Sequence, residues 1–247
     1  KRFFLNICAP NQYSKYMKKN IALVTGGFSG EAVISYKTAV TIGNNLDPDQ
    51  YDVYKIDINP NGWFYELTDG RIMAVDKNDF SLQLDSKKIN FDAVFIGMHG
   101  TPGEDGKLQG YFDTLKIPYT SCDAATSAIT FNKRYTVAVA KMAGVAVANS
   151  VHLFKNLPVP ASQVADQLKL PVFVKPNSGG SSIGMSKVEE AGDLEAAIEK
   201  AFKEDNQVLV EEMIQGREFT VGVFKTKGNI IVLPLTEVKA HDDKSFF

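Results

Sequence analysis

Apolar runs and stretches of helical periodicity alternate along the first part of the chain. Asn20 to Thr25 is a short apolar run that predicts a strand, and a glycine-rich turn follows it. Val33, Tyr36 and Val40 then recur at the three- to four-residue spacing of a helix. Tyr51 to Asp57 alternates apolar with polar residues, which predicts the next strand. A strand, a turn, a helix and a second strand in this order favour a parallel, Rossmann-like sheet.

The pattern changes twice before the middle of the chain. Trp63 to Asp85 alternates weakly and contains turn signals, so we expect an antiparallel excursion there. Asp92 to Gly97 is a buried strand that runs into the loop 99–110, which holds His99 and four glycines. A loop at the carboxyl end of a strand is where α/β sheets bind ligands, although a lone histidine is more often structural. Pro118 to Thr120 predicts a last short strand before the pattern turns helical.

Helical periodicity dominates after this point, and we place the first domain boundary near Ser121. Asp123 to Ala143 predicts one long helix, which Gly144 ends. Val151 to Phe154 begins a new strand, and prolines after it introduce a helix that runs to Leu168.

The last third of the pattern predicts a helix and a hairpin. Asp193 is the expected N-cap of the helix, whose apolar side chains share one face, namely Leu194, Ala197, Ile198, Ala201 and Phe202. This face should pack on the sheet that carries Lys175. Residues 219–223 alternate, Gly228-Asn229 is a turn signal, and Ile230 to Leu235 supplies the returning strand of the hairpin.

A loop of small residues lies between two of the predicted strands. Pro171 to Val174 forms the first strand and delivers Lys175 into the loop Asn177 to Ser182, after which a second strand starts at Ile183. Glycine, serine and asparagine let backbone N–H groups fold around an anion, and Lys175 adds a full positive charge. The segment is therefore expected to close over phosphates. It is not a Walker loop, because no Gly-Lys-Ser/Thr opens a helix here.

The predicted strand Val208 to Val210 ends in an acidic hinge. Glu211 to Ile214 follows the strand, and Gly216 turns the chain. The backbone of such a hinge can hydrogen-bond an adenine between apolar walls, and Glu218 can accept from ribose hydroxyls. The alternative is a set of solvated glutamates on an ordinary lid, since most glutamates are surface residues. Lysine, glycine loop and acidic hinge in this order favour the nucleotide pocket.

Composition narrows the class of protein. The chain has 247 residues, 44% hydrophobic and 23% charged, so it is long enough for two domains with real cores. A net charge of −2 predicts neither nucleic-acid nor membrane-surface binding. Cys8 and Cys122 are far apart in sequence, which favours a reducing compartment, the cytoplasm, over a disulfide framework. Apolar runs are too short to span a membrane, and residues 1–16 lack the apolar core of a secretion signal.

Five motifs carry a resemblance to a known family. They are GGFSGEAVIS at 26–35, HGTPGEDGKLQG at 99–110, NK at 132–133, VKPNSGGSSIGMSKV at 174–188 and EEMIQGREFTV at 211–221. In this order they resemble the D-alanine–D-alanine ligase family of the ATP-grasp superfamily, over Met17 to Phe247. The loop tip Ser178-Gly179-Gly180 departs from the family pattern, because many relatives carry an arginine and an acid there.

The resemblance implies an α/β fold in three parts. Residues 17–121 would form a Rossmann-like substrate domain, 122–213 the central ATP-grasp domain and 214–247 the start of the C-terminal ATP-grasp domain. Residues 1–16 are expected to be an extension or a tag remnant. The family's catalytic lid lysine, late arginine and ligands for two Mg²⁺ or Mn²⁺ ions would lie beyond Phe247. On this basis we expect the chain on its own to be inactive.

The resemblance also implies a reaction and its residues. Members join two D-alanines for peptidoglycan synthesis by way of a D-alanyl phosphate made from ATP. The implied ATP-binding residues are Lys133, Phe173, Lys175, Gly180, Ser181, Ser182, Glu211, Glu212, Met213, Ile214 and Glu218. Glu31 and Ser181 are the implied catalytic residues, with Glu31 on the ammonium of the first D-alanine and His99 beside the substrate carboxylates. The simpler interpretation of Glu31 is that it complements the dipole of the helix that starts there.

Other functions compete with this interpretation. The nearest is an ATP-grasp ligase that makes D-alanyl-D-lactate or another dipeptide. A non-catalytic nucleotide-binding module is the second, and a Rossmann oxidoreductase is a distant third because no G-x-G-x-x-G follows the first strand. The resemblance further implies a homodimer through the first domain.

Overall fold

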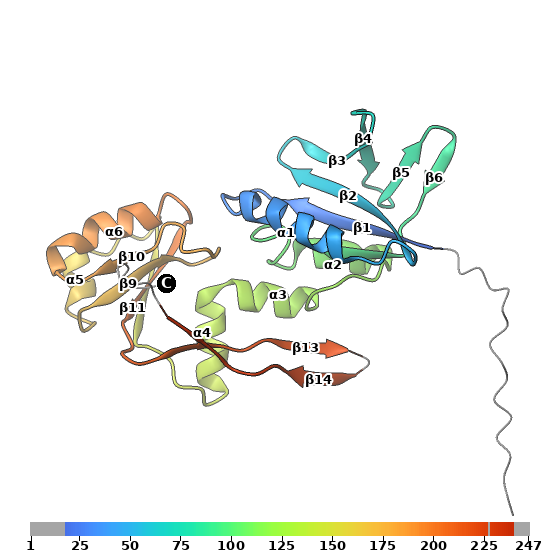
Figure 1. Cartoon of the computed structure of the whole chain (residues 1–247). Helices are drawn as coiled ribbons and strands as arrows, with labels where there is room; N and C mark the ends of the chain where they lie inside the picture. Colours follow the sequence, from blue (N-terminus) through green and yellow to red (C-terminus); the bar gives the residue numbers. More distant parts are fainter. Residues whose placement is uncertain (1–17, 227, 240–247) are drawn as a thin grey trace, which may run out of the picture. The chain divides into compact units, whose positions relative to one another are not determined.

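The computed structural model describes residues 18–226 and 228–239, and the chain divides into two compact units between Ala128 and Ile129 (Figure 1). This division falls inside helix α3 (Ala124–Phe131). The three predicted domain ranges remain predictions, and the extension at residues 1–16 lies outside the described residues.

A seven-stranded sheet forms the first unit, in the order β6-β5-β4-β3-β2-β1-β7. Its strands are β1 (Lys19–Gly26), β2 (Tyr51–Asn59), β3 (Gly62–Glu66), β4 (Ile72–Asp76), β5 (Ser81–Leu84), β6 (Lys87–Ile89) and β7 (Ala93–Ile96). β1 pairs in parallel with both β2 and β7, whereas β2 to β6 form an antiparallel series. The Rossmann-like opening and the antiparallel excursion are both confirmed. Pro118 to Thr120 contributes only one bridge, between Tyr119 and Val94.

Aromatic side chains fill the core of this unit. Phe80 and Phe112 are fully buried, and their ring centroids lie 4.9 Å apart in an edge-to-face arrangement. Phe112 belongs to α2 (Lys107–Leu115), so this contact fixes the helix on the first unit's core. The helix begins inside the segment 99–110, so only residues 99–106 of the expected loop lie outside it.

Helix α1 (Ala32–Asn45) forms where the periodicity predicts it, but it presents another face to the sheet. The spaced residues Val33, Tyr36 and Val40 are exposed, whereas Ser35 and Ala39 are buried. Small side chains on the buried face let the helix lie close to the sheet. The apolar periodicity therefore identified the helix and not its packing surface.

The second unit contains a four-stranded antiparallel sheet, in the order β10-β9-β11-β8. Its strands are β8 (Ser150–Phe154), β9 (Val172–Pro176), β10 (Ser186–Val188) and β11 (Gln207–Glu212). Its helices are α4 (Lys133–Met142), α5 (Ala161–Ala165) and α6 (Leu194–Ala201). The predicted apolar face of α6 is confirmed, because Leu194, Ala197, Ile198 and Ala201 are buried. α5 is shorter than predicted, and β10 starts three residues after Ile183 because residues 181–184 form a turn.

Two expected helix starts differ from the prediction. The single helix expected over 123–143 is two helices, α3 and α4, because Asn132 has an extended backbone and its side chain caps the N–H of Tyr135. Asp193 precedes α6 but makes no side-chain cap. A 3₁₀ turn, η1 (Ala191–Asp193), leads directly into the helix, so the backbone of Asp193 is helical rather than extended.

The last described segment forms two strand pairs. β13 (Val223–Thr226) and β14 (Asn229–Val232) make the predicted hairpin (Figure 1), with Gly228 at φ +80° in its turn. β12 (Glu218–Thr220) pairs with β15 (Thr236–Val238), so the predicted strand Ile230 to Leu235 is wrong in its second half. Within the described ranges 18–226 and 228–239, the helices are too short or too polar to cross a bilayer.

Candidate nucleotide-binding site

A cavity of about 750 Å³ lies in the second unit, at one end of β9 and β11. Its lining residues are Ala148, Phe173, Lys175, Met185, Glu211, Glu212, Met213, Ile214, Gln215, Gly216, Arg217, Glu218, Glu237, Val238 and Lys239. Most residues predicted for the base, the ribose and one phosphate contact are thus brought together: Phe173, Lys175, Glu211, Glu212, Met213, Ile214 and Glu218. This volume is in the range of small-molecule sites.

An ion pair stands at the centre of this cavity. β9 and β11 are antiparallel neighbours in which Lys175 faces Leu209 and Phe173 faces Glu211, so Lys175 reaches Glu211 diagonally. Its Nζ pairs with Glu211 Oε1, and the two side chains are only 24% and 19% exposed. The same Nζ lies 5.3 Å from the ring centroid of Phe173, which adds a cation–π contact. Partial burial means that solvent screens these charges less than it would on the surface.

Glu212 points to other partners. Its carboxylate accepts hydrogen bonds from the backbone N–H of Lys169, at 2.8 Å, and from Asn149 Nδ2, at 2.9 Å. These two bonds, the Lys169 N–H first, hold the pKa of Glu212 below its ordinary value. The carboxylate therefore ties together the segments that precede β8 and β9. Glu211, one residue earlier, is directed to Lys175 instead.

In the hinge after β11, one backbone N–H group is already hydrogen-bonded within the protein. The N–H of Met213 donates to the carbonyl of Pro171 at 2.9 Å and so extends the sheet by one bond. Ile214 is 72% exposed beside the cavity. Glu218 is also exposed and starts β12.

The glycine loop and Lys133 meet away from the cavity lining. Lys133 is the first residue of α4, and its Nζ donates to the carbonyl of Gly179 at 2.7 Å. Ser181 and Ser182 have φ values of 52° and 56°, so the loop backbone is left-handed at two consecutive serines directly after the tip. Lys133, Gly180, Ser181 and Ser182 therefore form one group around the loop. The short segment after Lys175 connects this group to the cavity.

Glu31 and His99 lie in the first unit. Glu31 is the N-cap residue of α1 and only 4% exposed. A Cβ at Gly100, where φ is +72°, would lie 2.6 Å from Glu31 Oε2, so the loop 99–110 passes directly over this carboxylate. His99 Nε2 is 2.9 Å from Thr38 Oγ1, and the His99 N–H donates to Ser35 Oγ at 2.9 Å. The two predicted substrate residues are thus neighbours.

Sequence reasoning missed several cavity residues. Arg217, directly before β12, forms an ion pair of 2.8 Å with Glu237 of β15, and it also lies over the ring of Phe219. Twenty residues separate the ion-pair partners in sequence, so only the pairing of Glu218 with Val238 brings them together. The predicted hairpin could have indicated these residues, because its returning strand must run beside the segment that follows the hinge.

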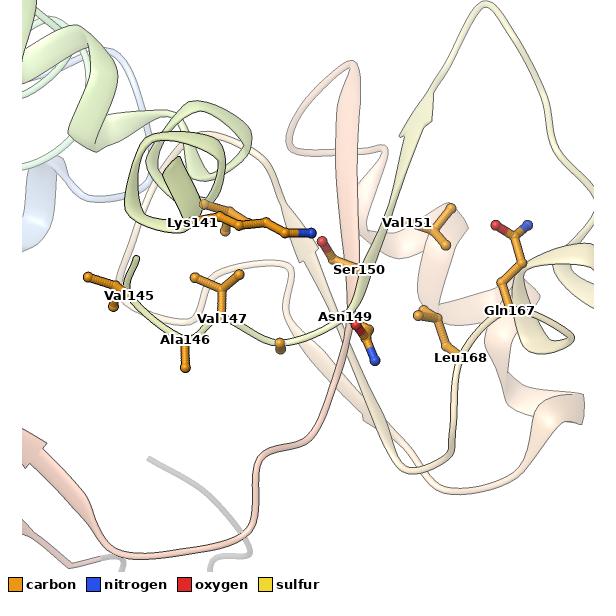
Figure 2. A pocket seen from close by; sticks show the side chains of 11 residues that line it. Lys141, Val145, Ala146, Val147, Asn149, Ser150, Val151, Gln167 and Leu168 are labelled. Carbon is orange, nitrogen blue, oxygen red and sulfur yellow. The ribbon is translucent and has the colours of Figure 1, made fainter. Parts of the chain in front are cut away.

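A second cavity, of about 500 Å³, shares the lining residue Ala148 with the first. Figure 2 shows this second cavity. Seven of its eleven lining residues are aliphatic, among them Val145, Val147 and Leu168. Figure 2 shows Lys141 reaching from α4 toward Ser150. It contains none of the predicted site residues.

The described part of the chain offers no metal centre of the usual kind. Within residues 18–226 and 228–239, no group of three or more histidine, cysteine, aspartate or glutamate side chains is arranged to hold an ion.

Known families and structures match both parts of the chain. Residues 20–122 match the family model "D-ala D-ala ligase N-terminus", and residues 132–247 match "D-ala D-ala ligase C-terminus". A D-alanine–D-alanine ligase from Parabacteroides distasonis is 46% identical over 92% of this chain and 69% of its own length.

Two solved structures are similar in fold. D-alanyl-alanine synthetase A from Vibrio cholerae superposes with a TM-score of 0.81 at 30% identity, over 92% of this chain and 68% of its own. The VanG D-Ala:D-Ser ligase from Enterococcus faecalis gives 0.77 at 30% identity, over 90% and 70%. ATP-grasp ligases of this kind use ATP and a divalent metal ion. The chain belongs to the D-alanine–D-alanine ligase family of the ATP-grasp superfamily.

Proposed function

We propose that the protein is an ADP-forming ligase that joins two D-alanines through a D-alanyl phosphate, for peptidoglycan precursor synthesis. The observation that carries the proposal is the cavity in which Lys175, Glu211 and Phe173 converge. The family assignment supports the same conclusion.

ATP would place its base and ribose in this cavity. Phe173 and Met213 supply apolar walls, and Glu211 accepts from the adenine amino group. Since the Met213 N–H is already bonded to Pro171, we assign the backbone contact with the base to Ile214. Glu218 would accept from the ribose hydroxyls.

The phosphates would lie between the cavity and the glycine loop. Lys175 and Lys133 contact Glu211 and the Gly179 carbonyl, respectively. Phosphate oxygens carry more charge than a carbonyl and are strong acceptors for an ammonium group. The two lysines would therefore turn to the α and β phosphates, and Gly180, Ser181 and Ser182 would close over the β and γ phosphates. Ser181 would donate its hydroxyl to the transferring group.

The amino-acid substrate would bind in the first unit. Buried Glu31 would pair with the ammonium of the first D-alanine, and His99 would lie near its carboxylate. A carboxylate oxygen then attacks the γ-phosphorus, the bond to the β-phosphate oxygen breaks, and ADP leaves. The amine of the second D-alanine attacks the acyl carbon, releases inorganic phosphate and loses a proton. Holding the first carboxylate in line is the main contribution of these side chains.

The divalent ion would neutralise phosphate charge, and we propose Mg²⁺ or Mn²⁺, two ions per site. Dependence on ATP supports a cytoplasmic location. The exposed apolar side chains of α1, Val33, Tyr36 and Val40, support a homodimer through the first unit.

The test is an assay of the full-length protein with ATP, magnesium and D-alanine. We expect release of ADP and formation of D-alanyl-D-alanine, detected by mass spectrometry. D-Lactate and D-serine offered as second substrates test the alternative, which the likeness to a D-Ala:D-Ser ligase keeps open. ADP release that requires one of these compounds instead of D-alanine would contradict the proposal.

A further inference from the structure

The amino end of α4 is held by a residue from another part of the chain. A helix leaves its first backbone N–H groups without partners inside the helix. The Lys133 N–H donates to the Asn177 carbonyl at 3.0 Å, and the Arg134 N–H donates to Asn177 Oδ1 at 2.9 Å. Asn132 satisfies the next group, the Tyr135 N–H. The first two donors of α4 are thus bonded to a single residue at the start of the glycine loop.

Asn177 is itself fixed on the sheet. It is completely buried, and its N–H donates to the carbonyl of Gln207 in β11 at 2.9 Å. Asn177 also follows Lys175 by two residues. One residue therefore connects α4, which carries Lys133, with β9, which carries Lys175, and with β11.

Further hydrogen bonds hold the start of the loop. The Ser178 N–H donates to Asp205 Oδ2 at 2.7 Å, and Asp205 Oδ1 accepts from the Gln207 N–H at 3.1 Å. The next residue, Gly179, accepts from Lys133 Nζ. The ammonium group of Lys133 thus contacts the loop at the residue directly after the one that Asp205 holds.

We infer that Asn177 is a positioning residue for nucleotide binding. It holds Lys133 against the glycine loop and fixes the position of Lys133 relative to Lys175. This inference rests on the proposed role of these groups in holding ATP phosphates. Two ammonium groups repel each other, so their convergence on one ligand requires a scaffold that holds both. Asn177 is this scaffold, because its backbone carbonyl and its side-chain oxygen accept hydrogen bonds from the first two N–H groups of α4.

The test compares two variants of the full-length protein that each remove a bond at the same helix end. Asn177→Ala removes the bond to the Arg134 N–H, and Asn132→Ala removes the bond to the Tyr135 N–H within α4. Loss of a helix cap typically costs enough to predict about a tenfold loss of ATP affinity for Asn177→Ala. Adenosine affinity should stay within about twofold, and Asn132→Ala should change ATP affinity by less than about threefold. Melting temperatures measure the stability loss of each variant.

Three results would overturn the inference: unchanged ATP affinity in Asn177→Ala, an equal loss of adenosine affinity, or an equal loss of ATP affinity in Asn132→Ala. Should Asn177→Ala fail to fold, Asn177→Ser replaces it in the comparison. Serine retains a shorter acceptor, so its loss of ATP affinity should lie between zero and that predicted for Asn177→Ala. A wild-type protein that binds ATP without making D-alanyl-D-alanine would contradict the proposed function and leave this inference standing.

Discussion

Neighbouring residues in the candidate site contact different partners. Glu211 and Glu212 are adjacent, yet successive side chains of a strand point to opposite faces. Glu211 consequently meets Lys175, whereas Glu212 meets Asn149 and the Lys169 N–H. We therefore propose that Glu211 faces the ligand, whereas the carboxylate of Glu212 holds the hinge in place.

Replacing Lys175 should weaken ATP binding. Lys175→Ala removes the partly buried ammonium group that we propose for the phosphate contact, and we expect the dissociation constant of ATP to rise about 10- to 100-fold. Isothermal titration with a non-hydrolysable ATP analogue measures it. Lys169→Ala is the control, because only the backbone of this exposed residue takes part in the site contacts. Equal affinities of Lys175→Ala and wild type would remove Lys175 from the phosphate site.

Replacing Glu31 should affect the amino acid and not the nucleotide. Glu31→Gln keeps the shape and removes the buried charge, so the KM of the first D-alanine should rise about 10- to 100-fold. The KM of ATP should stay the same in steady-state assays, as it should in the control variant Glu66→Gln, which changes an exposed glutamate of the same unit. A change confined to ATP kinetics would show that Glu31 is not on the substrate ammonium.

At the scale of secondary structure, the ends of helices and strands position the residues of the predicted D-alanine site. Residues 97–106 connect β7 with α2, and they cross α1 at its first turn, where Gly100 adopts φ +72°. Only a residue without Cβ fits directly above the Glu31 carboxylate. The end of β7 and the start of α1 thus define the predicted D-alanine site together.

A pair of glycine variants separates strain from contact. Gly100→Ala and Gly70→Ala each place a side chain at positive φ, and this strain should lower the free energy of unfolding by about 1–2 kcal/mol. Gly100→Ala should lose more than Gly70→Ala, because its Cβ would lie only 2.6 Å from Glu31 Oε2. A Cβ at Gly70 meets nothing within 4 Å, whereas one at Gly100 meets Glu31 and Ser29. Only Gly100→Ala should raise the KM of D-alanine. Equal kinetics in the two variants would contradict a role for this close approach.

At the scale of the whole molecule, each unit has its own hydrophobic core. Phe80 and Phe112 belong to one core, and Leu153 and Leu194 belong to the other. The sequence contains a single tryptophan, Trp63, which packs against the first core. Its fluorescence therefore reports on the first unit specifically.

Core variants should distinguish the two units during unfolding. Phe112→Ala should destabilise the first unit by about 3–5 kcal/mol and lower the midpoint of the Trp63 fluorescence transition. Leu153→Ala should cost the second unit about 2–5 kcal/mol and leave the Trp63 midpoint in place. Thermal melts followed by fluorescence and by circular dichroism test this. An equal shift of the Trp63 midpoint in both variants would mean that the units unfold as one.

Local patterns predicted most elements because strand alternation and helix periodicity are properties of short segments. The strands around Lys175 and Glu211, the amphipathic helix after Asp193 and the hairpin at Gly228 are examples. The pattern failed where one polar side chain decided the outcome, as at Asn132, whose cap divides a helical stretch in two. It also failed on α1, where the small residues and not the large ones face the sheet.

The sequence alone determined the family, the glycine loop and the identity of the charged residues, since these depend on residue order. Tertiary structure decided which of those charges meet. The pairing of β9 with β11 joins Lys175 to Glu211, the pairing of β12 with β15 brings Glu237 to the cavity, and Asn177 binds the end of α4. These contacts link residues 20 to 43 positions apart. No local pattern contains them, because the free energy of each contact exists only once the chain has brought the two segments together.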